Sequence, residues 1–99
     1  MNTNISTVLI YNGPGIFPVC YESMKRELEA ELSPEYAIEE LNCNNVNCHN
    51  EPEVKAVFIP AGKAVKISEG LPTVSKMIKR VVVDNKNAAL YASGGAAIA

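Results

Sequence analysis

The sequence predicts a layered α/β domain with a mainly parallel sheet, and three observations support this prediction. Residues 8–11 (VLIY) and 56–59 (AVFI) are short apolar runs without alternation, which is typical of strands buried on both faces. Two amphipathic segments alternate with the predicted strands. Turns of small residues follow three of the strands. The predicted order is β-α-β-β-α-β in a single domain covering residues 1–99.

The N-terminal half of the chain predicts a strand, a helix and a second strand. The strand at 8–11 stops at residues 12–15 (NGPG), whose glycines and proline favour a turn. In residues 18–32 apolar side chains recur at three- and four-residue steps, and Ser33-Pro34 ends this helix. Residues 36–41 predict the second strand, at an edge of the sheet because it contains two glutamates.

The C-terminal half predicts a loop, a strand, a helix and a final strand, over residues 42–53, 56–59, 72–82 and 88–92 respectively. The loop is polar and rich in asparagine. The strand stops at residues 60–62 (PAG), and Pro72 suits the first turn of the helix. Residues 83–87 are expected to turn the chain into the last strand, which leads to Ala92-Ser93-Gly94-Gly95.

Composition excludes several classes of function. A net charge of −2, with the lysines spread along the chain, argues against a general affinity for nucleic acid or anionic membranes. No apolar run approaches the roughly 20 residues that a transmembrane helix needs, and no secretory signal is visible. The 3 cysteines, an odd number, do not suggest a disulfide framework. We therefore expect reduced thiols and a cytoplasmic location.

The turns after the strands are the predicted ligand site. In parallel sheets, ligands bind outside the carboxyl ends of the strands, so three turns should meet at one edge. Their backbone N–H groups could hold an anion or another small ligand, although the glycines could also simply serve a tight turn. The NGPG turn matches neither the dinucleotide-binding nor the P-loop pattern, and we expect no cofactor. The candidate ligand-binding residues are Asn12, Gly13, Gly15, Ala61, Gly62, Gly94 and Gly95.

Residues 8–15 (VLIYNGPG) resemble the opening of the N-terminal domain of eukaryotic biotin protein ligases, which is a class I glutamine-amidotransferase-like domain. The similarity continues in order along nearly the whole chain, at residues 32–37, 50–52, 57–62 and 90–95. It implies a three-layer, flavodoxin-like fold. It also implies a separate biotin-ligating domain as a partner in the same protein, and nothing in these 99 residues resembles that domain.

Two departures from the family pattern bear on activity. The family's Cys-Ala-Gly-Gly elbow aligns with residues 92–95, so Ala92 occupies the position of the nucleophilic cysteine. The first of two family glycines after the third strand is Ala61, and the triad's His and acidic residue lie beyond this chain. The resemblance therefore implies a noncatalytic or regulatory domain, a pseudoenzyme. The alternatives are a fragment of a Cys-His-Glu enzyme whose nucleophile is replaced, and a module that binds a small ligand or a protein.

Other reactive side chains have structural explanations. Ser93 only half matches the Gly-x-Ser-x-Gly elbow, because Tyr91 stands where the first glycine should be and no partner base is identifiable. We interpret it as a serine at the start of the next helix. Cys43, Cys48 and His49 have no usual zinc spacing and lack a fourth ligand, so no metal site is predicted.

Two further expectations concern Cys20 and self-association. Cys20 lies at the start of the first helix, where the helix N-terminus could lower the pKa of its thiol. Without a nearby base, we interpret it as a small, partly buried side chain. Because the chain ends just after the elbow, the sheet is expected to be truncated there, with an exposed last strand. Such an edge favours a homodimer.

Overall fold

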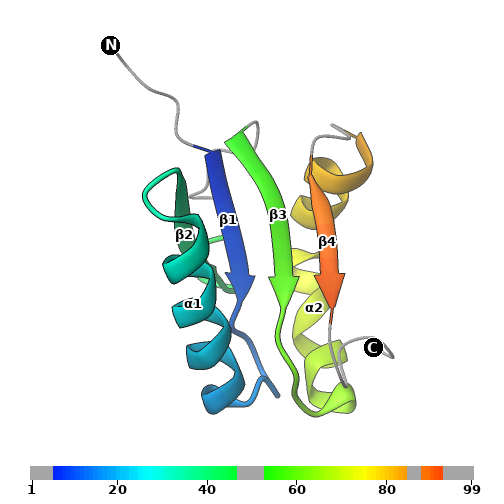
Figure 1. Ribbon diagram of the computed structural model, residues 1–99. Helices are drawn as coiled ribbons and strands as arrows, with labels where there is room; N and C mark the ends of the chain where they lie inside the picture. The colour runs from blue at the N-terminus through cyan, green and yellow to red at the C-terminus, as the bar shows by residue number, and fades with distance from the viewer. Residues whose placement is uncertain (1–5, 47–52, 85–87, 93–99) are drawn as a thin grey trace.

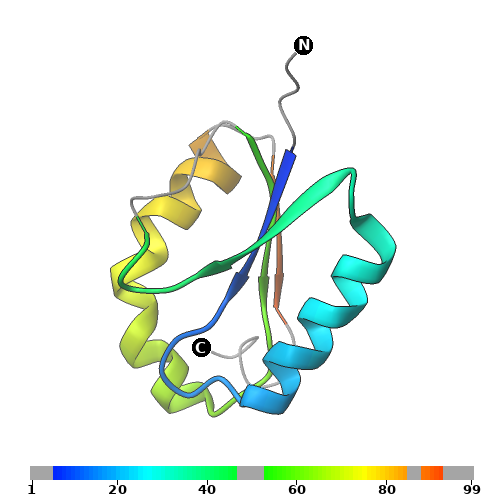
Figure 2. The ribbon, with the colours of Figure 1, turned by 90° about the vertical axis from the view of Figure 1, so that its left-hand side faces the viewer.

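The chain folds into a four-stranded, entirely parallel sheet with one helix on each face, in a computed structural model that describes residues 6–46, 53–84 and 88–92. The strands are β1 (Ser6–Tyr11), β2 (Tyr36–Leu41), β3 (Val54–Ile59) and β4 (Ala89–Ala92). The helices are α1 (Pro18–Leu32) and α2 (Ala64–Lys79), and α2 continues into a π-helical turn, η2 (Arg80–Asp84). Figure 2 shows the three layers edge-on, which confirms the predicted three-layer, flavodoxin-like α/β fold.

The strand order is β2-β1-β3-β4, which places the apolar β1 in the interior of the sheet and β2 at an edge, as predicted. Leu9 of β1 pairs with Val57 of β3, and neither side chain is exposed. Their burial follows from helices on both faces, which is why these strands lack an alternating pattern. The core that surrounds them comprises Ile10, Tyr11, Ile16, Tyr21, Leu41, Val54, Ile59, Ile67, Val74, Met77, Ile78 and Val81.

Helix α1 has the predicted bounds. Pro18 stands in its first turn, where the missing N–H leaves no hydrogen bond unmade. Ser33 adopts an extended conformation just before Pro34, as a residue before proline prefers, and this ends the helix. Tyr21 is the buried residue of α1, while Met24 and Leu28 pack against the core from half-buried positions.

Helix α2 corrects one prediction. It begins at Ala64, so the expectation that Pro72 opens the helix was wrong, because Pro72 lies in the interior of α2. The sequence prediction placed Pro72 in the first turn of the helix, where proline is tolerated, whereas in a helix interior Gly70 and Pro72 are both unfavourable. However, Ile67 lies on the same buried stripe as Val74 and Met77, and all three side chains are inaccessible to solvent. Burial of this additional apolar turn outweighs the two unfavourable helix residues, since tertiary packing supplies most helix stability.

The remaining elements agree with the predictions to within a few residues, and β3 begins two residues before the predicted position 56. Within the predicted loop at 42–53, residues 43–46 form a turn. Within the described parts of the chain, no helix is both long and apolar enough to cross a membrane.

Candidate functional site

The turns after β1 and β3 meet at the switch point of the sheet, where the direction of the strand order reverses. After β1 the chain passes through α1 to β2 on one side, and after β3 it passes through α2 to β4 on the other (Figure 1). Crevices outside the carboxyl ends of strands at such a switch point bind ligands in open α/β sheets. This edge is therefore the candidate site.

Backbone hydrogen bonds join the two turns. Ile16 and Gly62 form an isolated antiparallel bridge. The N–H of Phe17 donates to the carbonyl oxygen of Ala61 at 3.1 Å, and the N–H of Lys63 donates to that of Gly15 at 2.9 Å. The structure thus brings together the described turns that the sequence predicted to meet.

Close approach of the two turns explains two of their glycines. Gly15 has a φ of +88°, a conformation that side chains with a Cβ rarely adopt. A Cβ on Gly62 would overlap the carbonyl oxygen of Gly15 and lie 2.9 Å from the Cα of Ile16. Because these neighbours are backbone atoms, no side-chain rotation could make room, so a tight turn accounts for these glycines without a ligand.

Both helices point uncapped N-termini at this edge. The N-cap residues Phe17 of α1 and Lys63 of α2 make no side-chain cap hydrogen bond, and neither first turn contains an acidic residue. Backbone N–H groups at such ends have no partner within the helix and carry partial positive charge. The edge therefore presents hydrogen-bond donors suited to a carboxylate or phosphate.

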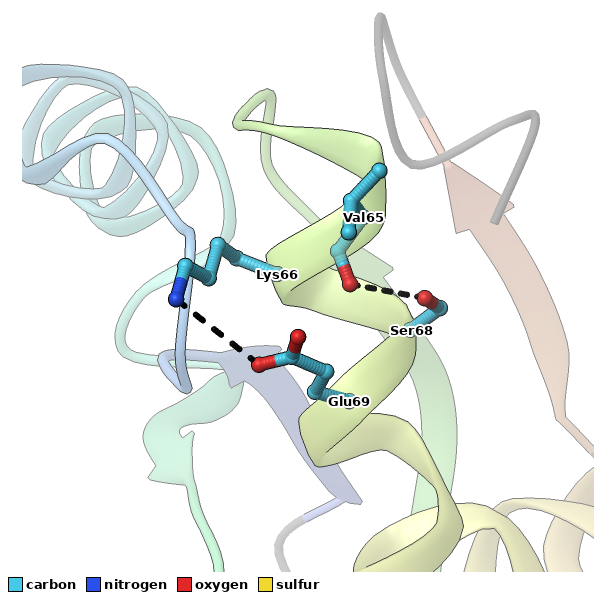
Figure 3. A network of polar contacts seen from close by, with 4 residues as sticks. All are labelled: Val65, Lys66, Ser68 and Glu69. Carbon is cyan, nitrogen blue, oxygen red and sulfur yellow. Dashed lines mark hydrogen bonds and ion pairs between the residues drawn. The ribbon is translucent and has the colours of Figure 1, made fainter.

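The lysine in the first turn of α2 is directed along the helix. The Lys66 Nζ lies 3.9 Å from Glu69 Oε1, and Ser68 Oγ donates to the carbonyl oxygen of Val65 at 2.8 Å (Figure 3). Both charged side chains are about 60% exposed, so this ion pair contributes little to stability. Backbone N–H groups, rather than this lysine, are therefore the main donors of the site.

Asn12 belongs to a polar network centred on a residue that sequence reasoning missed. The Asn12 Nδ2 donates to Glu40 Oε2 at 3.3 Å, and Asn42 Nδ2 donates to the same oxygen at 2.7 Å. Tyr21 Oη donates to Glu40 Oε1 at 3.3 Å, which ties α1 to the end of β2. In the sequence, Glu40 indicated only that its strand lies at an edge of the sheet. The signal that would have placed it beside Asn12 is the β1–β2 register, in which Glu40 pairs with Ile10.

This network predicts a pH-dependent loss of stability. Burial, then the negative charge of Glu40 and its hydrogen bond, raise the pKa of Tyr21 from 10.0 to about 12. Since the folded protein then holds this proton more tightly than the unfolded chain, the stabilisation is complete below pH 10 and is lost as the pH rises toward 12. By pH 11 we expect wild type to lose roughly 1 kcal/mol more stability than Tyr21→Phe. Urea unfolding of both proteins at pH 8 and pH 11 measures this difference, and equal losses would contradict it.

The last described strand ends at the same edge without a nucleophile. Ala92 closes β4 and pairs with Ile59, the last residue of β3. The strand end is thus beside the turn at 60–62, in the position that the resemblance assigns to a nucleophile. Ser93, Gly94 and Gly95 lie outside the described residues.

The cysteines form no described metal site. Cys20 is half-buried in the first turn of α1, as predicted, and Cys43 is exposed after β2. Cys48 and His49 lie outside the described residues. Across residues 6–46, 53–84 and 88–92, no three His, Cys, Asp or Glu side chains are grouped closely enough to hold a metal ion.

The fold and the site together define a three-layer α/β domain whose candidate ligand groups come mainly from the backbone. A scan against protein-family models found no match, and searches of curated proteins and of solved structures found none either.

Proposed function

We propose that this chain is a noncatalytic amidotransferase-like domain, similar to the N-terminal domain of biotin protein ligases, that binds a small ligand at the carboxyl edge of its sheet. One observation carries the proposal: where the two turns join at the switch point, α1 and α2 both begin without a side-chain cap, beside the end of β4 at Ala92. In a full-length protein of this family, the ligand site would lie in a domain beside the biotin-ligating domain, where binding could regulate that domain.

The missing chemistry supports a binding role. The methyl group of Ala92 cannot attack a carbonyl carbon, and a thiol at this position would still need a base to activate it. The chain has 1 histidine, His49, which precedes β3 in the sequence. Ammonia release from glutamine should therefore stay at the background rate.

The donors at the site favour an anionic ligand. The uncapped N-termini of α1 and α2 offer N–H groups and partial positive charge, and Lys63 adds an exposed ammonium group. Carboxylates and phosphates are the ligand groups that fit these donors.

A thermal-shift screen with biotin, ATP, glutamine and acetate tests the proposal. A ligand that binds only the folded chain raises the melting temperature. Lys63→Glu should reduce that rise because it places a negative charge at the N-terminus of α2. The matched control, Lys79→Glu at the other end of α2, should leave the rise unchanged. No rise with any compound, or an equal loss in both variants, would contradict a ligand site at this edge.

Ala92→Cys tests whether the strand end still has the environment of a nucleophile. We expect its thiol to react with iodoacetamide at least about fivefold faster at pH 7 than the thiol of Leu90→Cys, because β4 ends at the edge where both helices begin and a helix N-terminus lowers the pKa of a thiol. Peptide mapping by mass spectrometry separates these thiols from the native cysteines. Ala92→Cys should remain unable to hydrolyse glutamine, and glutamine hydrolysis would favour the alternative of a disabled enzyme fragment. Equal alkylation rates would contradict the expected environment.

We also propose that two copies of the chain associate along β4. This strand is last in the described strand order and has no charged residue, whereas the other edge, β2, has Glu39 and Glu40. Tyr91 is 52% exposed, although its ring stacks on that of Phe58 at 4.7 Å. An uncharged edge of this kind is open to pairing with another strand.

Sedimentation velocity tests the association. Wild type is expected to dimerise at high concentration, and Tyr91→Lys should shift it to monomer because a lysine blocks edge pairing. Tyr36→Lys places the same charge on β2 and should leave the dimer intact. A wild-type chain that stays monomeric at high concentration would contradict the proposal.

A further inference from the structure

The hydroxyl of Tyr11 is buried without a partner at the candidate site. Tyr11 is the last residue of β1, and its side chain is inaccessible to solvent. In the described part of the chain, its Oη is the one buried side-chain nitrogen or oxygen atom that makes no hydrogen bond. A buried hydroxyl that has lost its bonds to water destabilises the arrangement that buries it. The closed arrangement around Tyr11 thus carries an energetic penalty.

The turn after β1 and a glycine of α2 enclose this hydroxyl. A Cβ on Gly70 would lie 2.6 Å from Tyr11 Oη and 2.6 Å from Pro14 Cδ, and a Cβ on Gly13 would overlap the Tyr11 ring and hydroxyl. The oxygen itself is buried. Because a bridging water needs room beside the atom that it bonds, the hydroxyl can gain a partner only if its surroundings move.

Residues 12–15, which we name the strap, are the segment best placed to move. Glycines flank Pro14 on both sides, and Gly15 holds the strap to α2 by accepting the N–H of Lys63 at 2.9 Å. At its start, the Asn12 N–H donates to the carbonyl oxygen of Leu41 at 2.8 Å, which fixes that end to β2. Opening the strap at its far end would free the Lys63 N–H and uncover the Tyr11 hydroxyl.

We propose that the strap opens and that the Tyr11 hydroxyl then donates a hydrogen bond to a carboxylate oxygen of a ligand bound against α2. The choice of ligand chemistry rests on the proposed function. The groups uncovered are hydrogen-bond donors, the Tyr11 hydroxyl and the Lys63 N–H, and both lie against α2. The unpartnered hydroxyl raises the free energy of the closed strap. This cost is removed when the strap opens and a ligand oxygen accepts a hydrogen bond from the hydroxyl.

Amide hydrogen exchange measured by NMR tests the strap without any ligand. Opening exposes the Lys63 amide, so its exchange reports the population of the open state. Tyr11→Phe removes the unpartnered hydroxyl and should slow this exchange roughly tenfold. The Ile67 amide, which donates to the Lys63 carbonyl oxygen at 2.9 Å, is the internal reference, and Tyr36→Phe is the control variant. If the Lys63 amide exchanges at the same rate in Tyr11→Phe as in wild type, the proposal that the strap opens is overturned.

An acetate titration tests the ligand contact. Acetate should shift the amide resonances of Gly13, Gly15 and Lys63 in wild type, against sodium chloride at matched ionic strength. Tyr11→Phe should weaken acetate binding about tenfold, since a hydrogen bond to a charged acceptor is lost. Equal binding in wild type and Tyr11→Phe overturns the role of Tyr11 while leaving the proposed ligand site in place. If acetate causes no shift in wild type, the contact with a carboxylate is overturned. The exchange experiment then still tests whether the strap opens.

Discussion

Gly62→Ala is expected to lower the free energy of unfolding by about 3 kcal/mol, the upper part of the range for overpacked sites. The new methyl group would overlap the carbonyl oxygen of Gly15, and the Ile16–Gly62 bridge holds the two turns together at that point. The clash is with backbone, so relief requires the turns to separate. The variant should therefore lose stability and the geometry of the candidate site together.

Urea denaturation followed by circular dichroism measures the effect. The neighbouring variant Ala61→Gly is the control, because it changes a turn residue without adding an atom and should cost less than about 1 kcal/mol. The midpoint should move while the slope with urea stays constant, as expected when only stability changes. A Gly62→Ala protein within about 0.5 kcal/mol of wild type would show that the turns are not packed as described.

Leu9→Ala is expected to lower the free energy of unfolding by about 2 to 5 kcal/mol. Leu9 lies on the central strand β1, pairs with Val57, and has no exposed surface. The substitution removes buried apolar surface and leaves a cavity. This cavity can collapse only partly, because strands flank it on both sides. The total free energy of unfolding of a domain of this size is about 5 to 15 kcal/mol, so the substitution removes a large share of it.

The control for this substitution is Val65→Ala on the first turn of α2. Val65 is 73% exposed, so its truncation should change stability by no more than about 0.5 kcal/mol. Thermal unfolding of the three proteins gives the comparison. Similar losses in Leu9→Ala and Val65→Ala would contradict the assignment of β1 to the centre of the core.

The elements whose pattern is local could be predicted from the sequence. Helix α1 has a clear apolar period and a proline at each end, and its bounds agree with the prediction. The start of α2 could not be predicted from local signals, because Gly70 and Pro72 indicate a break. The buried position of Ile67 depends on how α2 lies across the sheet, which is a tertiary feature.

The same distinction applies to the site. Turns at the ends of parallel strands must lie at one edge, so the approach of Gly15 and Gly62 followed from topology alone. The partners of Glu40 depend on strand register and on the position of Tyr21 across from β2. The unpartnered Tyr11 hydroxyl depends on the packing of α2 against the turn after β1, which no sequence pattern encodes.

Mapping ligand-induced changes in the two-dimensional NMR spectrum of the whole chain tests the central claim most directly. With biotin, ATP, glutamine or acetate, at least one compound should shift amides of the turns at residues 12–16 and 61–67. Amides near Ser33 and Glu53, at the opposite edge of the sheet, should stay unchanged. Shifts confined to the opposite edge, or no shifts with any compound, would contradict a ligand site at the carboxyl edge.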